Sequence, residues 1–220
     1  MTQSVPLRLH SMGEAALVCE LPAPATLEQQ QRIWALAAEA MRWRGVREAL
    51  PGMNNLSLLF DPDQIDGAEL EMQVLSAWPQ LNAASIEGRS IEIPVKYGGE
   101  FGPDLADVAS HTGLTPSEVV RRHSEGDYVV YLLGFLPGFA FMGGLASELA
   151  TPRRTAPRLE VPAGAIGIGG EQTGIYPMVS PGGWQLIGRT PLKLFDPTAA
   201  EPTLLRPGDH VRFVVESLET

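Results

Sequence analysis

Glycine is spread very unevenly along this chain of 220 residues. Residues 1–96 contain 5 of the 23 glycines, and residues 97–220 contain the other 18. Glycine is disfavoured inside helices and strands and marks turns, bulges and close backbone approaches. We therefore expect two domains that meet near residue 96, the first bearing helices and the second built from short strands and many turns.

The first domain combines two capped helices with strand patterns. One helix begins after Thr26, which is followed by a Gln at the capping-box spacing, and another begins after Asp66, which is followed by a Glu. Strand patterns precede and separate these helices, and apolar residues alternate over 91–95 in a closing strand. The resulting order, close to β-α-β-β-α-β, predicts a ferredoxin-like domain over residues 1–96.

The second domain, residues 97–220, has helix signals only near its beginning. Thr115 starts the clearest helix, because Pro116 suits its first turn and Glu118 has the capping-box spacing. From Tyr128 onward, short apolar runs alternate with turns rich in glycine and proline. Many short strands with regular turns predict a barrel or a sandwich. The whole chain is therefore assigned to the α+β class.

Composition excludes several classes of protein. The net charge of −10 argues against a broad nucleic-acid surface. Cys19 is the only cysteine, so no internal disulfide forms, and residues 1–10 lack the apolar stretch of a signal peptide. The apolar stretch LLGFLPGFAFMGGL, residues 132–145, is too short for a membrane span and is broken at Pro137 and Gly138. We expect a cytoplasmic protein with no membrane partner and no nucleic-acid partner.

Familiar catalytic motifs are missing from the sequence. The only lysines are Lys96 and Lys193, and there is no G-x-x-x-x-G-K-[ST] sequence, so the chain has no P-loop. There is no G-x-S-x-G elbow, and the four histidines lie far apart without zinc-ligand spacing. No metal site is predicted, and an enzyme built from this chain would need another arrangement of residues.

Three segments of the second domain combine the features of a binding site. Residues 132–145 place three phenylalanines on glycine-rich backbone. Residues 151–164 gather three arginines on backbone stiffened by proline, which suits bidentate binding of a carboxylate or phosphate. Residues 169–190 set polar and aromatic side chains among glycine-rich turns that can form anion-binding nests. Their structural alternatives are a barrel corner, a salt-bridged loop and an ordinary hairpin.

The phenylalanines of residues 132–145 are expected to face two ways. One set fills the barrel core, and the other lines a ligand cleft or a partner interface beside the loop at 171–189. Side chains alternate along a strand, and Pro137 and Gly138 would break that alternation between the two sets.

Long runs of the second domain resemble the allophanate hydrolase subunit 1 family, also called the KipI family, which includes the B subunit of bacterial 5-oxoprolinase. The matching runs are YGGEFGPDL, GFLPGFAFMGGL, PRLEVPAGAIGIGGEQTGIYPMVSPGGWQLIGRTPLKLFDP and HVRF. The first domain matches more loosely, through GEAALVCEL and GVREALPGMNNLSLLFDP. The resemblance covers nearly the whole chain.

The resemblance implies a ferredoxin-like N-terminal domain, a cyclophilin-like β-barrel and two protein partners. One partner is a KipA or subunit 2-type protein (PxpC-like), and the other is a third subunit of the LamB/YcsF type (PxpA-like). Such a 5-oxoprolinase complex hydrolyses 5-oxoproline (pyroglutamate) to glutamate at the expense of ATP. We expect ATP, with magnesium, to be shared with the partner subunits, no tightly bound cofactor, and no activity from this chain alone.

Two other functions stay open beside the enzyme subunit. Some members of the family inhibit a sporulation histidine kinase, and the subunit pair resembles the carboxyltransferase part of urea carboxylase, in the urea and allophanate pathway. If the polar groups of residues 153–189 converge in one concave pocket, an enzyme is favoured, whereas scattered groups favour a regulator that needs only a surface.

The candidate site residues rest on physical grounds. Among the arginines, Arg158 is expected to lie closer to the site than Arg153 or Arg154, and a cationic His123 would be favoured at the end of its helix. The catalytic candidates are His123, Arg158, Glu171 and Arg189. The substrate-binding candidates are Phe135, Pro137, Gly138, Gln172, Thr173, Tyr176, Ser180, Gly183 and Trp184.

Two positions depart from the family pattern. The family usually has Tyr where this chain has Phe141, and it usually has Ser where this chain has Ala165. Each change removes a hydroxyl group. If either hydroxyl contacts the substrate, this member differs from its relatives in substrate or in activity.

Overall fold

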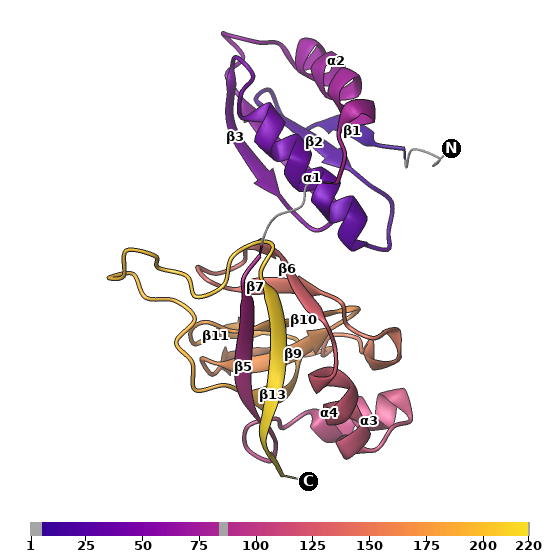
Figure 1. Ribbon diagram of the computed structural model, residues 1–220, viewed down its shortest axis with the longest axis vertical. Helices are drawn as coiled ribbons and strands as arrows, with labels where there is room; N and C mark the ends of the chain where they lie inside the picture. Colours follow the sequence, from indigo (N-terminus) through magenta and orange to yellow (C-terminus); the bar gives the residue numbers. More distant parts are fainter. Residues whose placement is uncertain (1–5, 84–87, 220) are drawn as a thin grey trace. The chain divides into compact units, whose positions relative to one another are not determined.

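A computed structural model describes residues 6–83 and 88–219 of the chain. The chain divides into two compact units, Met1–Ile86 and Glu87–Thr220 (Figure 1). Each unit has its own sheet and its own buried core.

The first unit is a four-stranded antiparallel sheet with two helices. Its strands lie in the order β1-β2-β4-β3. The elements are β1 (Arg8–Ser11), β2 (Ala16–Glu20), α1 (Leu27–Ala40), β3 (Val46–Pro51), β4 (Asn55–Phe60), α2 (Gly67–Ala77) and the short 3-10 helix η1 (Trp78–Gln80).

Both helices of this unit begin where the sequence predicts. Thr26 accepts a hydrogen bond from the Gln29 backbone, and the Gln29 side chain accepts one from the Thr26 backbone, which completes the capping box of α1. Asp66 caps α2 in the same position by accepting from the Glu69 backbone. The core of the unit joins the helix faces to alternate residues of the sheet: Ile33, Leu36, Leu70 and Val74 pack with Leu17, Cys19, Leu56 and Leu58.

The predicted closing strand of the first domain is wrong, and so is the boundary at residue 96. The segment containing Ile91, Ile93 and Val95 forms β5 (Ser90–Gly98) of the second unit, where it pairs in parallel with β13 (His210–Glu219). In the first unit, β1 fills the sheet edge beside β2 instead. A short turn joins β1 to β2, so β1 reaches that edge at little cost in loop entropy. Alternation therefore identifies a strand correctly but does not assign it to the right sheet.

The second unit is a closed barrel with two helices packed against it (Figure 1). The barrel runs β10-β7-β6-β13-β5-β12-β9 and closes on itself, while β8 and β11 form a separate antiparallel pair. The α+β class and the barrel are thus confirmed. The remaining elements are α3 (Leu105–Thr112), α4 (Pro116–Ser124), β6 (Tyr128–Leu133), β7 (Ala140–Gly143), the 3-10 helix η2 (Ser147–Leu149), β8 (Arg158–Val161), β9 (Ala165–Gly169), β10 (Gln172–Ile175), β11 (Ser180–Gly182) and β12 (Gln185–Arg189).

Two separate apolar clusters occupy the second unit. The barrel interior holds alternate residues of its strands, including Ala140 and Met142 of β7. The opposite faces of the same strands build a second cluster outside the barrel, closed by Val161 of the β8–β11 pair. This outer cluster contains Phe139, Val161, Ala165, Tyr176, Trp184 and Leu186, with Leu136 and Phe141 packed against it.

Candidate ligand pocket

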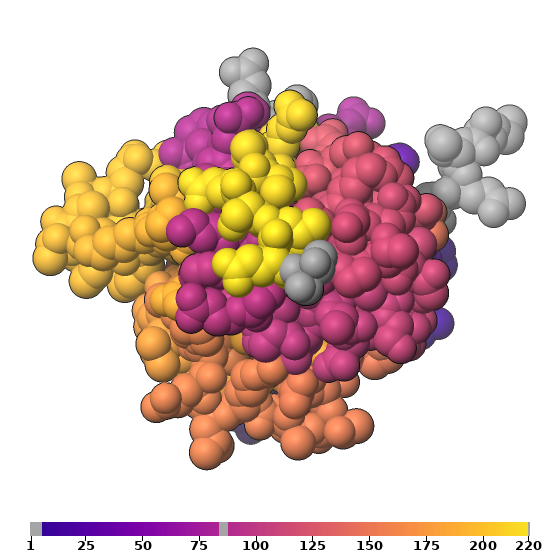
Figure 2. All heavy atoms as spheres, turned by 90° about the horizontal axis from the view of Figure 1, so that it is seen from below, coloured from indigo at the N-terminus to yellow at the C-terminus, as the bar shows by residue number. Residues whose placement is uncertain are grey.

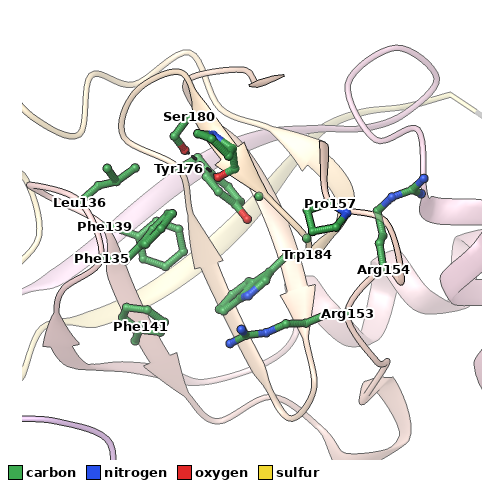
Figure 3. A pocket seen from close by; sticks show the side chains of 13 residues that line it. Phe135, Leu136, Phe139, Phe141, Arg153, Arg154, Pro157, Tyr176, Ser180 and Trp184 are labelled. Atoms are coloured by element: carbon green, nitrogen blue, oxygen red, sulfur yellow. Dashed lines mark hydrogen bonds between the residues drawn. The ribbon is translucent and has the colours of Figure 1, made fainter. Parts of the chain in front are cut away.

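A pocket of about 430 Å³ opens above the outer cluster, and we call it the phenylalanine pocket. It lies within the usual size range of small-molecule sites. In Figure 3 the phenylalanines lie on one side of the pocket, and Trp184 and Pro157 lie on the other. The lining residues are Phe135, Leu136, Phe139, Phe141, Arg153, Arg154, Pro157, Tyr176, Ser180, Pro181, Gly182, Gly183 and Trp184.

The turn between β6 and β7 forms the aromatic side of this pocket. Phe139 is 1% exposed and contacts Phe135 and Phe141 at ring-centroid distances of 5.6 and 4.8 Å. Phe135 is 63% exposed and has a φ of 65°, a left-handed conformation that is uncommon for a bulky residue. Such backbone strain persists when the surrounding structure holds it, and it is concentrated at binding sites.

The expectation that these phenylalanines face two ways is partly wrong. None of the three belongs to the barrel core: Ala140 and Met142 of β7 are in that core, Phe139 and Phe141 belong to the outer cluster, and Phe135 is mostly exposed in the turn. The other part of the expectation agrees with the structure, since Phe135 and Phe141 line a pocket together with residues of the 171–189 loop.

Phe135→Ala is expected to lower the free energy of unfolding by less than about 1 kcal/mol, because this side chain is mostly exposed. Phe139→Ala, which removes a fully buried ring from the same turn, should cost about 3–5 kcal/mol. Urea denaturation of the two variants measures the difference. Equal losses would mean that Phe135 is a packing residue.

Tyr176 and Trp184 form the floor of the pocket opposite the turn. Their rings meet the buried Phe139 edge-on at 5.1 and 5.5 Å. Burial raises the pKa of the Tyr176 phenol, so the hydroxyl stays protonated and able to donate near neutral pH. Gly182 lies against this hydroxyl, and a Cβ there would stand 2.4 Å from it. Glycine is needed at this position because any side chain would displace the phenol.

Asp104 holds the arginine-bearing segment in place behind the pocket. Its carboxylate is 2% exposed and accepts from both Arg158 Nη atoms at 2.7 and 2.8 Å and from Arg154 Nη1 at 2.9 Å. It also accepts from the Leu186 backbone N–H at 2.7 Å. Although Asp104 is the N-cap residue of α3, its side chain makes no capping bond. The carboxylate instead ties three segments of the second unit together.

Arg153 is the arginine of this segment that remains available to a ligand. It forms no ion pair within the part of the chain that the structure describes, and its guanidinium carbon lies 5.8 Å from the centroid of the Trp184 ring (Figure 3). Arg154 also lines the pocket, whereas Arg158 does not. For this pocket the order of the arginines is the reverse of the expected one, and Arg158, which makes two hydrogen bonds to Asp104, lies outside the lining.

The predicted binding residues divide into two groups. Phe135, Tyr176, Ser180, Gly183 and Trp184 line the phenylalanine pocket. Pro137, Gly138, Gln172 and Thr173 do not. Gly138 has a φ of 81° and faces the segment at Leu194 and Phe195, where a Cβ would approach within 3.0 Å. It shapes the turn without contacting the pocket.

The four catalytic candidates lie apart from one another. Arg189 lines a different pocket, Glu171 is exposed at the turn between β9 and β10, and Arg158 is paired with Asp104. His123 is fully buried in the interior of the second unit. These residues do not form one catalytic group.

His123 is a neutral structural residue in this fold. Thr173 donates its hydroxyl to the Gly167 carbonyl, so the 3.0 Å contact between His123 Nε2 and Thr173 Oγ1 has the imidazole as donor. His123 Nδ1 then accepts from the Tyr97 hydroxyl at 2.8 Å. Burial lowers the pKa of His123 to about 3, so the cationic form expected from the helix dipole is wrong.

The buried His123 should make stability depend on pH below neutrality. Its pKa is lower in the folded than in the unfolded chain, so the unfolded state binds more protons and stability falls as pH drops from about 6.5 towards 3. Between pH 7 and pH 5 this histidine should account for a loss of about 2 kcal/mol. Urea unfolding of His123→Gln should lack this part of the slope, and the exposed His111→Gln should retain it. Identical slopes in both variants would contradict a neutral buried His123.

Sequence reasoning misses several pocket residues and the residue that organises them. Leu136, Pro157, Pro181 and Gly182 line the pocket but are absent from the predicted set. Asp104 is absent from it too. A signal exists, since an Asp follows Gly102 and Pro103 at a helix start, where its charge suits either a cap or a buried cation.

No helix in residues 6–83 and 88–219 has both the length and the apolar character that a membrane span requires.

Comparison with known proteins gives consistent results over nearly the whole chain. Residues 7–205 match the family described as carboxyltransferase domain, subdomain C and D. The B subunit of 5-oxoprolinase from Escherichia coli O157:H7 is 53% identical over 208 residues, which cover 94% of this chain and 95% of that protein. The corresponding B subunit from Haemophilus influenzae is 49% identical over 94% of this chain and 97% of its own length.

A solved structure supports the same fold at lower sequence identity. The urea carboxylase of Kluyveromyces lactis superposes with a TM-score of 0.77 and 20% identity. The match covers 95% of this chain and 22% of that protein. At this identity the likeness shows a shared fold and carries no statement about activity.

Proposed function

Because this chain belongs to the family of 5-oxoprolinase B subunits, we propose that it is the substrate-holding component of an enzyme that hydrolyses 5-oxoproline to glutamate. On this proposal the phenylalanine pocket receives the lactam ring. The aromatic walls would exclude water from the ring, and the cation at the edge would bind the carboxylate of the substrate. The partner subunits would complete the reaction.

The position of Arg153 carries this proposal. It belongs to a segment of three arginines, and the other two are held by Asp104. A guanidinium without an ion pair to any described residue, beside an apolar pocket, suits a carboxylate, because Arg binds carboxylates through two parallel hydrogen bonds. A small ring with one carboxylate therefore matches the chemistry of this pocket.

The residues of the pocket can bind and orient a substrate but do not supply a general base. The lining contains no histidine and no carboxylate among the described residues, and its polar side chains belong to Arg153, Arg154, Tyr176 and Ser180. The protonated Tyr176 hydroxyl can donate to a carbonyl oxygen, which would help to hold the lactam group. The group that activates water for ring opening would come from a partner subunit.

We also propose that ATP and its magnesium ion bind with the partner subunits, or at a surface shared with them. A lactam is a poor electrophile, and phosphorylation of its oxygen by ATP would make ring opening far easier. Magnesium prefers carboxylate and phosphate oxygens, whereas the phenylalanine pocket offers arginine, tyrosine and serine. The residues of this pocket thus fit an anionic substrate and do not fit a metal ion.

The partners proposed for this chain are a KipA or subunit 2-type protein and a LamB/YcsF-type protein. The test is to co-purify the chain with both candidates and to assay ATP-dependent formation of glutamate from 5-oxoproline. We expect activity from the full complex and none from this chain alone. Robust turnover by the verified isolated chain, or an assembled complex that never acts on 5-oxoproline, would overturn the proposal.

A carboxyltransferase role is the second candidate, because the matching family is described by that activity. A biotin-linked carboxyl group transferred to or from a small amide would be its reaction, with the same pocket holding the amide. Release of labelled carboxyl groups by the complex, in the absence of glutamate formation, would favour this role. The convergence of Arg153, Tyr176 and Trp184 on one pocket favours either of these roles over a kinase regulator that needs only a surface.

A further inference from the structure

A second pocket of the barrel unit is lined by three cationic side chains, none of which lines the phenylalanine pocket. We call it the basic pocket; its volume is about 430 Å³. Both lysines of the chain line it, together with an arginine, and no carboxylate of the described residues does. The lining residues are Lys96, Phe101, Ala163, Pro177, Arg189, Thr190, Pro191, Leu192 and Lys193.

Two of these cations are placed directly opposite each other. Arg189 of β12 and Lys96 of β5 are register partners in an antiparallel pair, and both side chains are exposed. Like charges at such positions have their Cβ atoms only about 5 Å apart and destabilise the pair of strands. The chain has a net charge of −10 and contains more acidic than basic residues, yet no acidic residue that the structure describes lines this pocket. The arrangement therefore opposes stability unless an anion lies between the two cations.

The contacts of Arg189 and Lys96 leave their positive charges available to a ligand. Arg189 uses Nε to bond the Ala163 carbonyl at 3.0 Å, which fixes the guanidinium, while its outer nitrogens form no ion pair with any described residue. Lys96 likewise forms no ion pair in the described ranges, and its Nζ lies 5.3 Å from the centroid of the Phe101 ring. Lys193 is partly neutralised, because it pairs with Asp196 at 2.7 Å.

Residues of β5, of β12 and of the segment that follows β12 line the basic pocket. The segment between β12 and β13, drawn in gold, projects from the side of the barrel and begins with the residues of one wall (Figure 2). Gly164, with a φ of 81°, connects the two pockets: its N–H bonds the Tyr176 carbonyl and its carbonyl accepts from the Thr190 N–H. Tyr176 lines the phenylalanine pocket and the next residue, Pro177, lines the basic one. The two pockets are therefore lined by consecutive residues at this point of the chain.

We propose that the basic pocket binds a small organic anion that carries a phosphate or carboxylate group. The anionic group would lie between Lys96 and Arg189, and the remainder of the molecule would contact Phe101 and Leu192. The paired strands hold the two backbone positions at a set spacing, and the hydrogen bond to the Ala163 carbonyl restrains the Arg189 guanidinium, which lowers the entropy lost on binding an anion. The pocket also has the volume of a small-molecule site.

The test uses the full isolated chain in low salt, with pyrophosphate as the phosphate probe and glutarate as the carboxylate probe. We expect at least one probe to raise Tm and to bind in calorimetry, and the probe that binds identifies the chemistry. Lys96→Gln and Arg189→Gln should each weaken binding at least fivefold. The matched control, Arg42→Gln, removes an exposed charge from the turn that follows α1 in the first unit and should leave the affinity unchanged.

Three results would overturn the proposal. The first is the absence of any Tm shift with either probe, and the second is a loss of affinity in Arg42→Gln as large as that in Lys96→Gln and Arg189→Gln. The third is a lower Tm of unliganded Lys96→Gln than of the unaltered chain, which would show that the facing charges do not oppose stability. Binding is measured without partners or substrate turnover. Its outcome is therefore independent of the 5-oxoproline assay, and either hypothesis can fail alone.

Discussion

Asp104→Asn is expected to lower the free energy of unfolding by about 3 kcal/mol, the largest stability effect of any single polar substitution in the barrel unit. The carboxylate is buried and accepts from two arginines and one backbone N–H. Asparagine keeps the shape but loses the charge, so Arg154 and Arg158 are left without their counter-ion. Because both arginines remain partly exposed, the loss should fall at the lower end of the range for buried pairs.

The same substitution should also release the segment that carries Arg153. Urea denaturation measures the stability, and hydrogen exchange of residues 152–158 measures the release. Asp107→Asn is the matched control, because it removes an exposed carboxylate from the same helix and should cost less than about 1 kcal/mol. If both variants lose the same stability, Asp104 does not organise the segment.

The role of Asp104 shows the limit of local sequence signals. The arginine segment can be recognised by composition, and its proline content correctly indicates an irregular path. Which arginine faces a ligand depends on a carboxylate about 50 residues earlier in the chain, and nothing local specifies that contact. The sequence favours Arg158 because it lies at the beginning of a run that matches the family, yet the bonds of Arg154 and Arg158 to Asp104 leave Arg153 as the available cation.

Helix positions are predictable because their signals are local. The caps at Thr26, Asp66 and Thr115 each lie within a few residues of the backbone groups that they bond. The partner of β5 is not predictable in this way, because β13 lies more than 100 residues later and pairs with it in parallel. The alternation of apolar residues in β5 fits any sheet with one buried face.

The phenylalanine stretch illustrates the same limit within one strand. Its composition correctly indicates a turn with aromatic side chains, and these side chains line a pocket. The sequence prediction places one set of these phenylalanines in the barrel core and the other at a ligand cleft or a partner interface. In β7 the barrel interior takes Ala140 and Met142, whereas Phe141 and the preceding turn residue Phe139 belong to the outer cluster. A strand with two apolar faces cannot be oriented from its pattern alone.

Arg153→Gln is expected to lower kcat/KM of the assembled complex for 5-oxoproline by about 10- to 100-fold, mainly by raising KM. This follows from the loss of one hydrogen-bonded charge pair with the substrate carboxylate, worth about 1.5–3 kcal/mol. Stability should change by less than about 0.5 kcal/mol, because the side chain is exposed and forms no ion pair with any residue of the described ranges.

Steady-state kinetics on the purified complex measures this effect, and Arg212→Gln on the exposed face of β13 is the matched control. A raised KM in Arg153→Gln, with normal kinetics in Arg212→Gln, would place the substrate carboxylate in the phenylalanine pocket. An unchanged KM in Arg153→Gln, in a complex that assembles normally, would show that the carboxylate binds elsewhere. Arg153→Lys separates charge from geometry: a single ammonium cannot make two parallel bonds, so this variant should recover only part of the affinity.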